Sequence, residues 1–236
     1  MGALRRLARD EDGFSLTELI VAIALGGIVL AAALTFFTTG VISSAQVQDR
    51  SDAAQRARIG FDRVTSLLQA QVCNGVGDSG TPVVAGDGNT VTFTADMTKV
   101  DDPPMGYKLR YLPAGQELWV DSYVLGAEDP NTGYRSWPGS PVRSEQLMQR
   151  VVPDGATHPF RYYGTDDTTT GDPVELGATA ALTTAERQRV LRIDLTLRAL
   201  PTRTNTTNDR PATLLSTQSY AGSNIVQSRL DEGPRC

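Results

Sequence analysis

The octapeptide GFSLTELI at residues 13–20 decides how the first part of this chain folds. It lies between a short charged leader and an apolar run. Within that run, residues 19–37 are 19 amino acids without a charge. A helix needs about 20 apolar residues to cross the hydrocarbon core of a bilayer. We therefore expect a membrane-spanning helix that starts at this octapeptide.

Glu18 is the unusual residue of this segment, since it is the only charge between Phe14 and Asp49. An acidic side chain at mid-membrane depth costs roughly 2.5 kcal/mol or more, so a partner of opposite charge is expected. The apolar run contains no basic residue that could serve. Cleavage of the chain after Gly13 would create a partner, the new amine of Phe14.

This arrangement resembles the N-terminus of type IV pilins and type II secretion pseudopilins. In that family a prepilin peptidase cuts between glycine and phenylalanine and methylates the new amine. The glutamate at the fifth mature position then meets the terminal amine of a neighbouring subunit. The resemblance implies that Gly13 ends the leader, that Phe14 is the mature N-terminus and that Glu18 is the assembly glutamate.

An ordinary secretory signal peptide or an uncleaved anchor is the alternative for this segment. Arg5, Arg6 and Arg9 would form the basic start, and cleavage after Ala45 would leave Gln46 as the first residue. The protein would then be a Sec-exported or membrane-anchored extracytoplasmic binding protein. An apolar core of 19 residues is longer than the usual 7–15 of such a peptide. In either case the arginines place the leader in the cytoplasm.

Composition limits the possible functions of the chain. The net charge of −5 argues against a nucleic-acid binder, which would carry a basic patch. The single histidine excludes a multi-histidine metal site. No serine lies in a nucleophile elbow and no glycine-rich phosphate loop follows a predicted strand, so we expect neither an enzyme nor a cofactor.

The periodicity of the chain changes near residue 75. Proline is absent before Pro82, which favours one helix that extends to about residue 71. Its second half has an apolar stripe made of Val47, Ala54, Ala57, Phe61, Val64 and Leu68. After a glycine-rich loop at residues 75–88, apolar residues alternate within residues 91–97, 107–111, 118–125 and 189–199, which is typical of antiparallel strands with one covered face.

These patterns predict an α+β fold in which a long N-terminal membrane-spanning helix packs on an antiparallel β-sheet head. We expect a leader at residues 1–13 and a transmembrane or filament-core half-helix at residues 14–45. The globular head, with the second half of the helix, would occupy residues 46–236. The resemblance implies the same pilin-like architecture.

Two cysteines fit an exported domain with one bridge. Cys73 lies where the helix should end and Cys236 is the last residue, so a bond between them would tie the C-terminus to the helix. Pilin heads commonly close with a C-terminal disulfide, which favours this pairing. A free or intermolecular thiol at Cys236 is the alternative.

Other polar residues give weaker signals. Asp166, Asp167 and Asp172 could bind calcium through oxygen ligands, as some pseudopilins do in a C-terminal loop, but a solvated turn fits their spacing better. His158 has no second ligand or base nearby in the sequence and is expected in a loop. The triplet that begins at Asn205 fits a glycosylation sequon. No metal site is therefore predicted.

The segment PFRYYG at residues 159–164 predicts core packing on a strand. It also resembles the Phe-x-Tyr-Tyr strand of the larger minor pilins and pseudopilins of the W and J types, as do residues 190–197 and 214–224. The resemblance implies a minor pilin or pseudopilin of a pilus, a type II secretion pseudopilus or a DNA-uptake machine. Its partners would be other pilin or pseudopilin subunits, the prepilin peptidase and the membrane. The processed, N-methylated subunit would span the cytoplasmic membrane once with an extracytoplasmic head, and would reach the cell surface on assembly.

Overall fold

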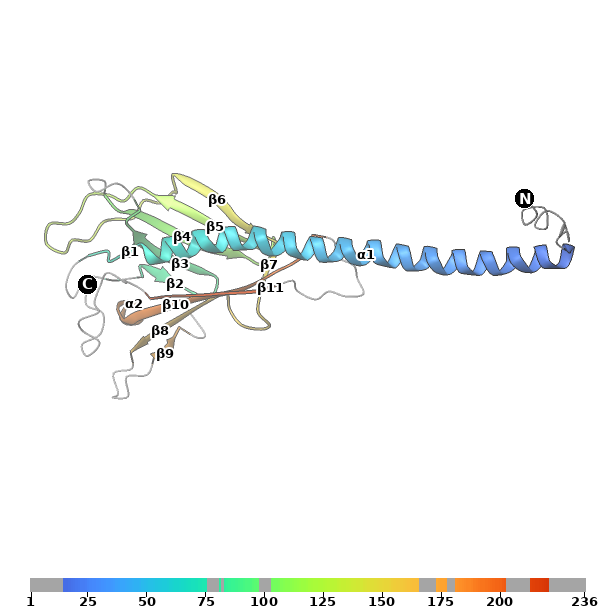
Figure 1. Cartoon of the computed structure of the whole chain (residues 1–236). Helices are drawn as coiled ribbons and strands as arrows, with labels where there is room; N and C mark the ends of the chain where they lie inside the picture. Colours follow the sequence, from blue (N-terminus) through green and yellow to red (C-terminus); the bar gives the residue numbers. More distant parts are fainter. Residues whose placement is uncertain are drawn as a thin grey trace, which may run out of the picture. The chain divides into compact units, whose positions relative to one another are not determined.

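The computed structural model describes residues 15–75, 81, 83–97, 103–165, 173–177, 181–202 and 213–220. The chain divides into two compact units, Met1–Gln48 and Asp49–Cys236. A helix, α1 (Leu16–Gln69), has residues in both units, and the described strands all belong to the second unit (Figure 1). This order of elements confirms the α+β prediction of a long apolar helix followed by antiparallel strands.

Helix α1 ends slightly earlier than the sequence predicted. The helix stops at Gln69, whereas the pattern placed its end at about residue 71. Gln71 and Val72 instead form strand β1 (Gln71–Val72) and pair with Ala95 and Thr94. The backbone groups of these two residues thus bond to a sheet rather than to the preceding helical turn.

The first sheet has the strand order β1-β3-β4-β5-β6, with β2 paired to β3, and its pairs are antiparallel. Its other strands are β2 (Ala85–Gly86), β3 (Thr90–Ala95), β4 (Met105–Leu112), β5 (Glu117–Tyr123) and β6 (Arg143–Gln149). The alternation within residues 91–97, 107–111 and 118–125 correctly predicted β3, β4 and β5. Within residues 75–88, where the sequence predicted a glycine-rich loop, Ala85 and Gly86 form β2 by pairing with β3.

The second sheet has the strand order β11-β10-β8-β9, with β7 paired to β10. It comprises β7 (Val151–Pro153), β8 (Phe160–Thr165), β9 (Pro173–Leu176), β10 (Val190–Ala199) and β11 (Thr213–Tyr220), and a short helix α2 (Thr184–Arg189) precedes β10. Three of the four alternating apolar side chains predicted on β10 are fully buried. Leu191 is half-buried, at the point where the register with β8 shifts between Val190 and Arg192.

The described strands of the head therefore form two antiparallel sheets. The chain passes from the first sheet to the second at Arg150, which separates β6 from β7 and has a φ of 53°. Two contacts hold this residue: its carbonyl accepts from Leu200 N at 2.7 Å, and its Nε donates to the Pro201 carbonyl at 3.0 Å. Few non-glycine residues adopt such a positive φ. Because the switch depends on the backbone of Arg150, the periodicity of the side chains did not indicate it.

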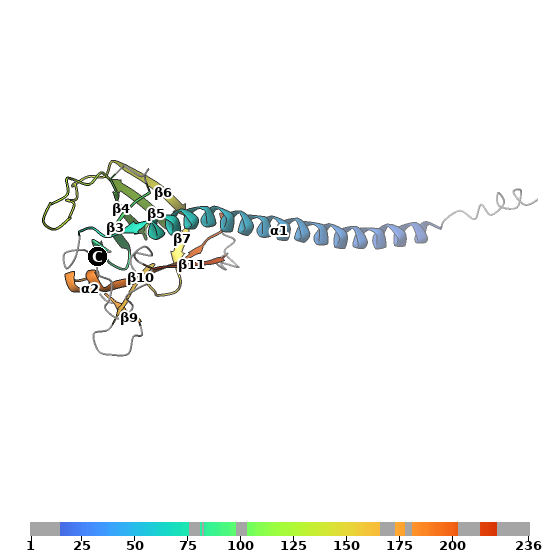
Figure 2. The same ribbon diagram turned by 60° about the vertical axis from the view of Figure 1, so that its left-hand side comes forward.

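The C-terminal part of α1 packs on the edge strands of both sheets (Figures 1 and 2). At β6, Gly60 approaches Leu147 and Met148, and at β11 Thr65 donates a hydrogen bond to the Thr217 hydroxyl at 3.2 Å. The buried helix residues are Ala53, Ala57, Gly60, Phe61, Val64, Leu67 and Leu68. Val47 was wrongly predicted in this stripe: it is 63% exposed, because it precedes the head unit.

Tyr162 on β8 connects the two sheets inside the core. Its side chain is 2% exposed, and its hydroxyl donates to the carbonyls of Thr90 at 2.6 Å and Asp87 at 3.1 Å. Burial raises the pKa of this phenol well above its usual value. Phe160 is equally buried, whereas Tyr163 faces the other side of the strand and is half-buried. The predicted aromatic core segment is thus confirmed for two of its three rings.

Candidate functional site

The first turn of α1 carries the functional candidate Glu18 in a hydrogen-bonded motif. Ser15 immediately precedes the helix, and its Oγ accepts from Glu18 N at 3.2 Å. In return, Ser15 N donates to Glu18 Oε2 at 3.1 Å, and Ser15 Oγ lies 3.2 Å from the same oxygen. This reciprocal pattern is a capping box, in which an N-cap serine and a glutamate three residues later satisfy each other's backbone amides.

The local sequence explains why the motif forms here. Ser-x-x-Glu before an apolar run is the capping-box signature, and an N-cap serine is worth about 1 kcal/mol to a helix. The partial positive charge of a helix N-terminus also favours a carboxylate in the first turn. Glu18 is exposed, and the two hydrogen bonds that its carboxylate accepts from Ser15 both end on Oε2. Within the described part of the chain, Oε1 has no hydrogen-bond partner.

The apolar segment that follows is not covered by other described residues of the chain. All residues from 15 to 44 are exposed, and α1 is long and apolar enough to cross a membrane. Its polar side chains bond inward: the hydroxyls of Thr35 and Thr39 donate to carbonyls one turn earlier, at 2.9 and 2.8 Å. Such bonds satisfy hydroxyl groups where water is absent. A continuous apolar surface of this size needs lipid or protein against it.

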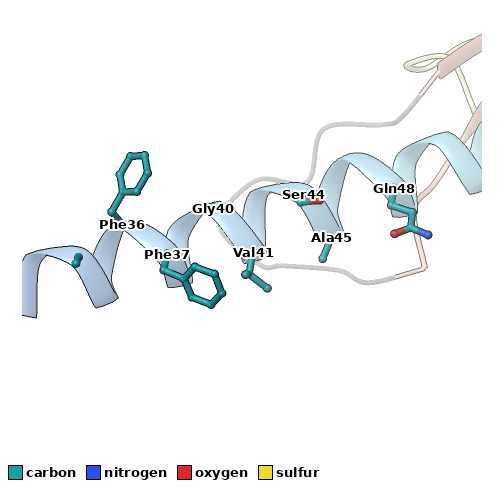
Figure 3. A pocket seen from close by; sticks show the side chains of 8 residues that line it. Phe36, Phe37, Gly40, Val41, Ser44, Ala45 and Gln48 are labelled. Carbon is teal, nitrogen blue, oxygen red and sulfur yellow. The ribbon is translucent and has the colours of Figure 1, made fainter. Parts of the chain in front are cut away.

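A shallow groove lies on the surface of this segment (Figure 3). Phe37 and Val41 point to the same side of the helix, while Phe36 points away from them. At Gly40 an added Cβ would meet no atom within 4 Å. The lining residues are Ala33, Phe36, Phe37, Gly40, Val41, Ser44, Ala45 and Gln48. None of them is ionisable, so this surface is suited to packing against apolar groups rather than to acid–base chemistry.

The processing and disulfide predictions fall partly outside the described residues. Gly13, Phe14 and Cys236 all lie there, so cleavage after Gly13 stays a prediction. Cys73 is half-buried and directly follows β1. Its pairing with Cys236 likewise stays a prediction. Of the predicted site residues, Glu18 and Cys73 lie within the described part of the chain.

The weaker polar candidates do not form a site in the described part of the head. Asp166, Asp167, Asp172 and Asn205 lie outside that part. His158 is exposed in the connection between β7 and β8. Among the residues that the structure describes, no group of three or more His, Cys, Asp or Glu side chains could hold a metal ion.

Two polar residues with structural roles were not identified from the sequence. Ser15 is the first, although the Ser-x-x-Glu spacing was available to indicate it. Asn74 is the second: it is 2% exposed, and its side chain donates to the Arg135 carbonyl at 3.1 Å and accepts from Arg135 N at 2.9 Å. This pair fixes the long β5–β6 connection beside Cys73, and no short-range pattern could have indicated it.

Comparison with known protein families finds a match at the N-terminus. Residues 8–34 match the family model described as the prokaryotic N-terminal methylation motif. The matched range contains Gly13, Phe14, Ser15 and Glu18, and it confirms the prepilin-type motif that the sequence predicted. A search of curated proteins found no match to the chain.

Proposed function

We propose, from the premise that the chain carries the prepilin-type N-terminal motif of the type IV pilin and pseudopilin family, that it is a minor pilin or pseudopilin. That family is structural, and its motif implies processing by prepilin peptidase and assembly with other pilin subunits. In this proposal the subunit is cut after Gly13, N-methylated at Phe14, and joins, initiates or tips a filament.

The observation that carries the proposal is the exposed carboxylate of Glu18 at the start of an uncovered apolar helix. In the assembled state this carboxylate would pair with the Phe14 amine of a neighbouring subunit. Two unit charges 4 Å apart attract by about 4 kcal/mol at an effective dielectric constant of 20. The pair would thus offset the cost of keeping a carboxylate in apolar surroundings.

The remaining surface of the half-helix supports the same role. Before assembly, the exposed segment would lie in the cytoplasmic membrane as a single span, with the head outside the cytoplasm. After assembly, the groove around Gly40 would receive apolar side chains of a neighbouring helix. The length of the chain after Gly13 exceeds that of typical mature major pilins, which supports a low-copy position in a pilus or pseudopilus.

The mature N-terminus provides the decisive test. Mass spectrometry and N-terminal sequencing of the membrane-extracted protein should find N-methylated Phe14, and Gly13→Val should leave the precursor uncut. Gly26→Val is the matched control, because it makes the same change within the apolar run and should leave cleavage intact. A mature protein that begins at Gln46, or a wild-type precursor that is never cut, would rule out this function.

Assembly is tested separately at Glu18. Glu18→Gln keeps the size of the side chain and removes its charge, so the subunit should be cleaved normally but largely excluded from sheared filaments. Asp52→Asn serves as the control, since it removes an exposed charge farther along the same helix. Equal incorporation of both variants would contradict the pairing of Glu18 with an amine.

A further inference from the structure

Capping boxes begin both α1 and α2 in the described part of the chain, and the difference between them is informative. At α2, Thr183 N and Thr183 Oγ1 each donate to Glu186 Oε2 at 2.8 Å, and Glu186 N donates back to Oγ1 at 3.3 Å. The second oxygen, Glu186 Oε1, accepts from Gly177 N at 3.3 Å. Both oxygens of this carboxylate are therefore used inside the head.

At α1 the same motif uses one carboxylate oxygen. Ser15 N and Ser15 Oγ both bond to Glu18 Oε2, at 3.1 and 3.2 Å. Oε1 has no partner among the described residues, and Glu18 is exposed. A carboxylate can accept about four hydrogen bonds, so these two leave it capacity for another donor.

We propose that Ser15 is a positioning residue for Glu18: by holding Oε2, it presents Oε1 to the incoming amine of a second pilin-like subunit. This inference rests on the proposed pairing of Glu18 with a neighbour's Phe14 amine. A free glutamate side chain would lose its rotamer freedom on pairing, whereas a side chain already held by Ser15 has lost most of it beforehand. The hydroxyl therefore lowers the entropic cost of the contact between subunits.

The cap also remains compatible with the assembled state. The amine would contact Oε1 while the bonds to Oε2 stay in place, so assembly need not break the first turn of the helix. Ser15 of the same chain thus orients Glu18, and the amine of the neighbouring subunit supplies its charged partner. The head has no equivalent site at α2, because Gly177 already occupies the second oxygen of Glu186.

The test uses the full-length protein in its native host, with the ratio of filament-bound to membrane-bound subunit as the readout. Ser15→Ala should be cleaved and methylated normally, while its incorporation falls roughly two- to tenfold. Ser15→Thr, which keeps the hydroxyl, should restore incorporation. Thr38→Ala is the matched control, because it removes an exposed hydroxyl of the same apolar helix that donates to the Thr35 carbonyl at 3.0 Å, far along the chain from Ser15 and Glu18.

Ser15→Gly separates positioning from simple helix capping. Glycine replaces serine at an N-cap with only a small loss of helix stability, but it has no hydroxyl. If Ser15 positions Glu18, the glycine variant should be incorporated as poorly as the alanine variant. Wild-type incorporation of the glycine variant would overturn the inference and leave a capping role.

Other outcomes are also distinguishable. If Ser15→Ala is cut at Gly13 and incorporated like the wild type, the inference is wrong and the proposed function stands. If the Ser15 variants are not cut, Ser15 acts in processing and the inference is again wrong. If the wild type itself is not cut at Gly13, the proposed function fails.

Discussion

Gly60 of α1 packs directly against β6, and its replacement by alanine gives a sharp test of the head's packing. A Cβ built at Gly60 would lie 2.6 Å from the Leu147 carbonyl oxygen and would overlap the side chain of Met148. Contacts below 3.0 Å are essentially never seen for real Cβ atoms. Met148 is 3% exposed, so it has little room to move away.

Two opposing effects set the size of the change. Alanine favours a helix interior over glycine by about 1 kcal/mol. Overpacking a core costs about 1–3 kcal/mol, and we expect the upper end because a backbone oxygen of β6 cannot rotate away as a side chain could. Gly60→Ala should therefore destabilise the head by about 2 kcal/mol. For a domain of this size, that loss corresponds to a fall in melting temperature of about 4–8 °C.

The assay is thermal and urea unfolding of the soluble head from residue 46 onward, followed by circular dichroism. Gly139→Ala is the matched control: Gly139 is exposed, and a Cβ there meets nothing within 4 Å. Its stability should stay within about 0.5 kcal/mol of the wild type. If Gly60→Ala is as stable as the wild type or more stable, α1 and β6 are not in close contact, and the reasoning is refuted.

Three further predictions concern the head. Tyr162→Phe should cost about 1 kcal/mol in urea unfolding, because the carbonyls of Asp87 and Thr90 lose the hydrogen bond from the buried hydroxyl, while Thr90 keeps the one from Asp87 N. The hydrogen bond and charge of Arg161 lower the pKa of Glu175 in the folded protein. The pair therefore stabilises the fold at pH values above the pKa that Glu175 has in the unfolded chain. This stabilisation is lost as the pH falls through the lower pKa of the folded state. Glu175→Gln should thus cost at most about 1 kcal/mol at pH 7, since both side chains are partly exposed, and the difference should vanish in acid. Finally, if Cys73 and Cys236 pair, mass spectrometry of the non-reduced head should find a monomer lighter by two hydrogens than the reduced form; two free thiols would contradict the bridge.

Elements with a strong repeating pattern were predicted well from the sequence. The alternation around Leu195 identified β10, and the absence of proline identified the long helix, because each pattern covers enough residues to outweigh local exceptions. The prepilin-type motif was also readable, because its residues occur in one short stretch, whereas cleavage at Gly13 and the role of Glu18 stay predictions. Ser15 could have been added from its spacing to Glu18 alone.

Features that depend on contacts between distant residues were not predictable in this way. The switch between sheets occurs at Arg150, a residue type that does not favour a positive φ, and contacts around residues 200–201 hold it. Nothing lies within 4 Å of a Cβ built at Gly26 or Gly40 in the apolar run. Gly60 is the helical glycine that packing requires, and only the position of β6 reveals this.

The distribution of charge along α1 suggests why one exposed carboxylate is kept in an apolar segment. Apart from Glu18, no charge occurs in residues 15–48, and charged residues begin at Asp49, where the head unit starts. In a bilayer, the carboxylate would raise the free energy of the subunit by about 2.5 kcal/mol or more at depth. The Ser15 cap satisfies Oε2, so the unpartnered Oε1 is the atom that makes the carboxylate costly in the bilayer. An amine of a neighbouring subunit would remove this cost, which favours the assembled state over the membrane state. Removing the carboxylate should then have two consequences at once: the contact between subunits is lost, and the subunit becomes more stable in lipid. An assembly-defective Glu18→Ala subunit should accordingly accumulate in the membrane fraction as a processed protein.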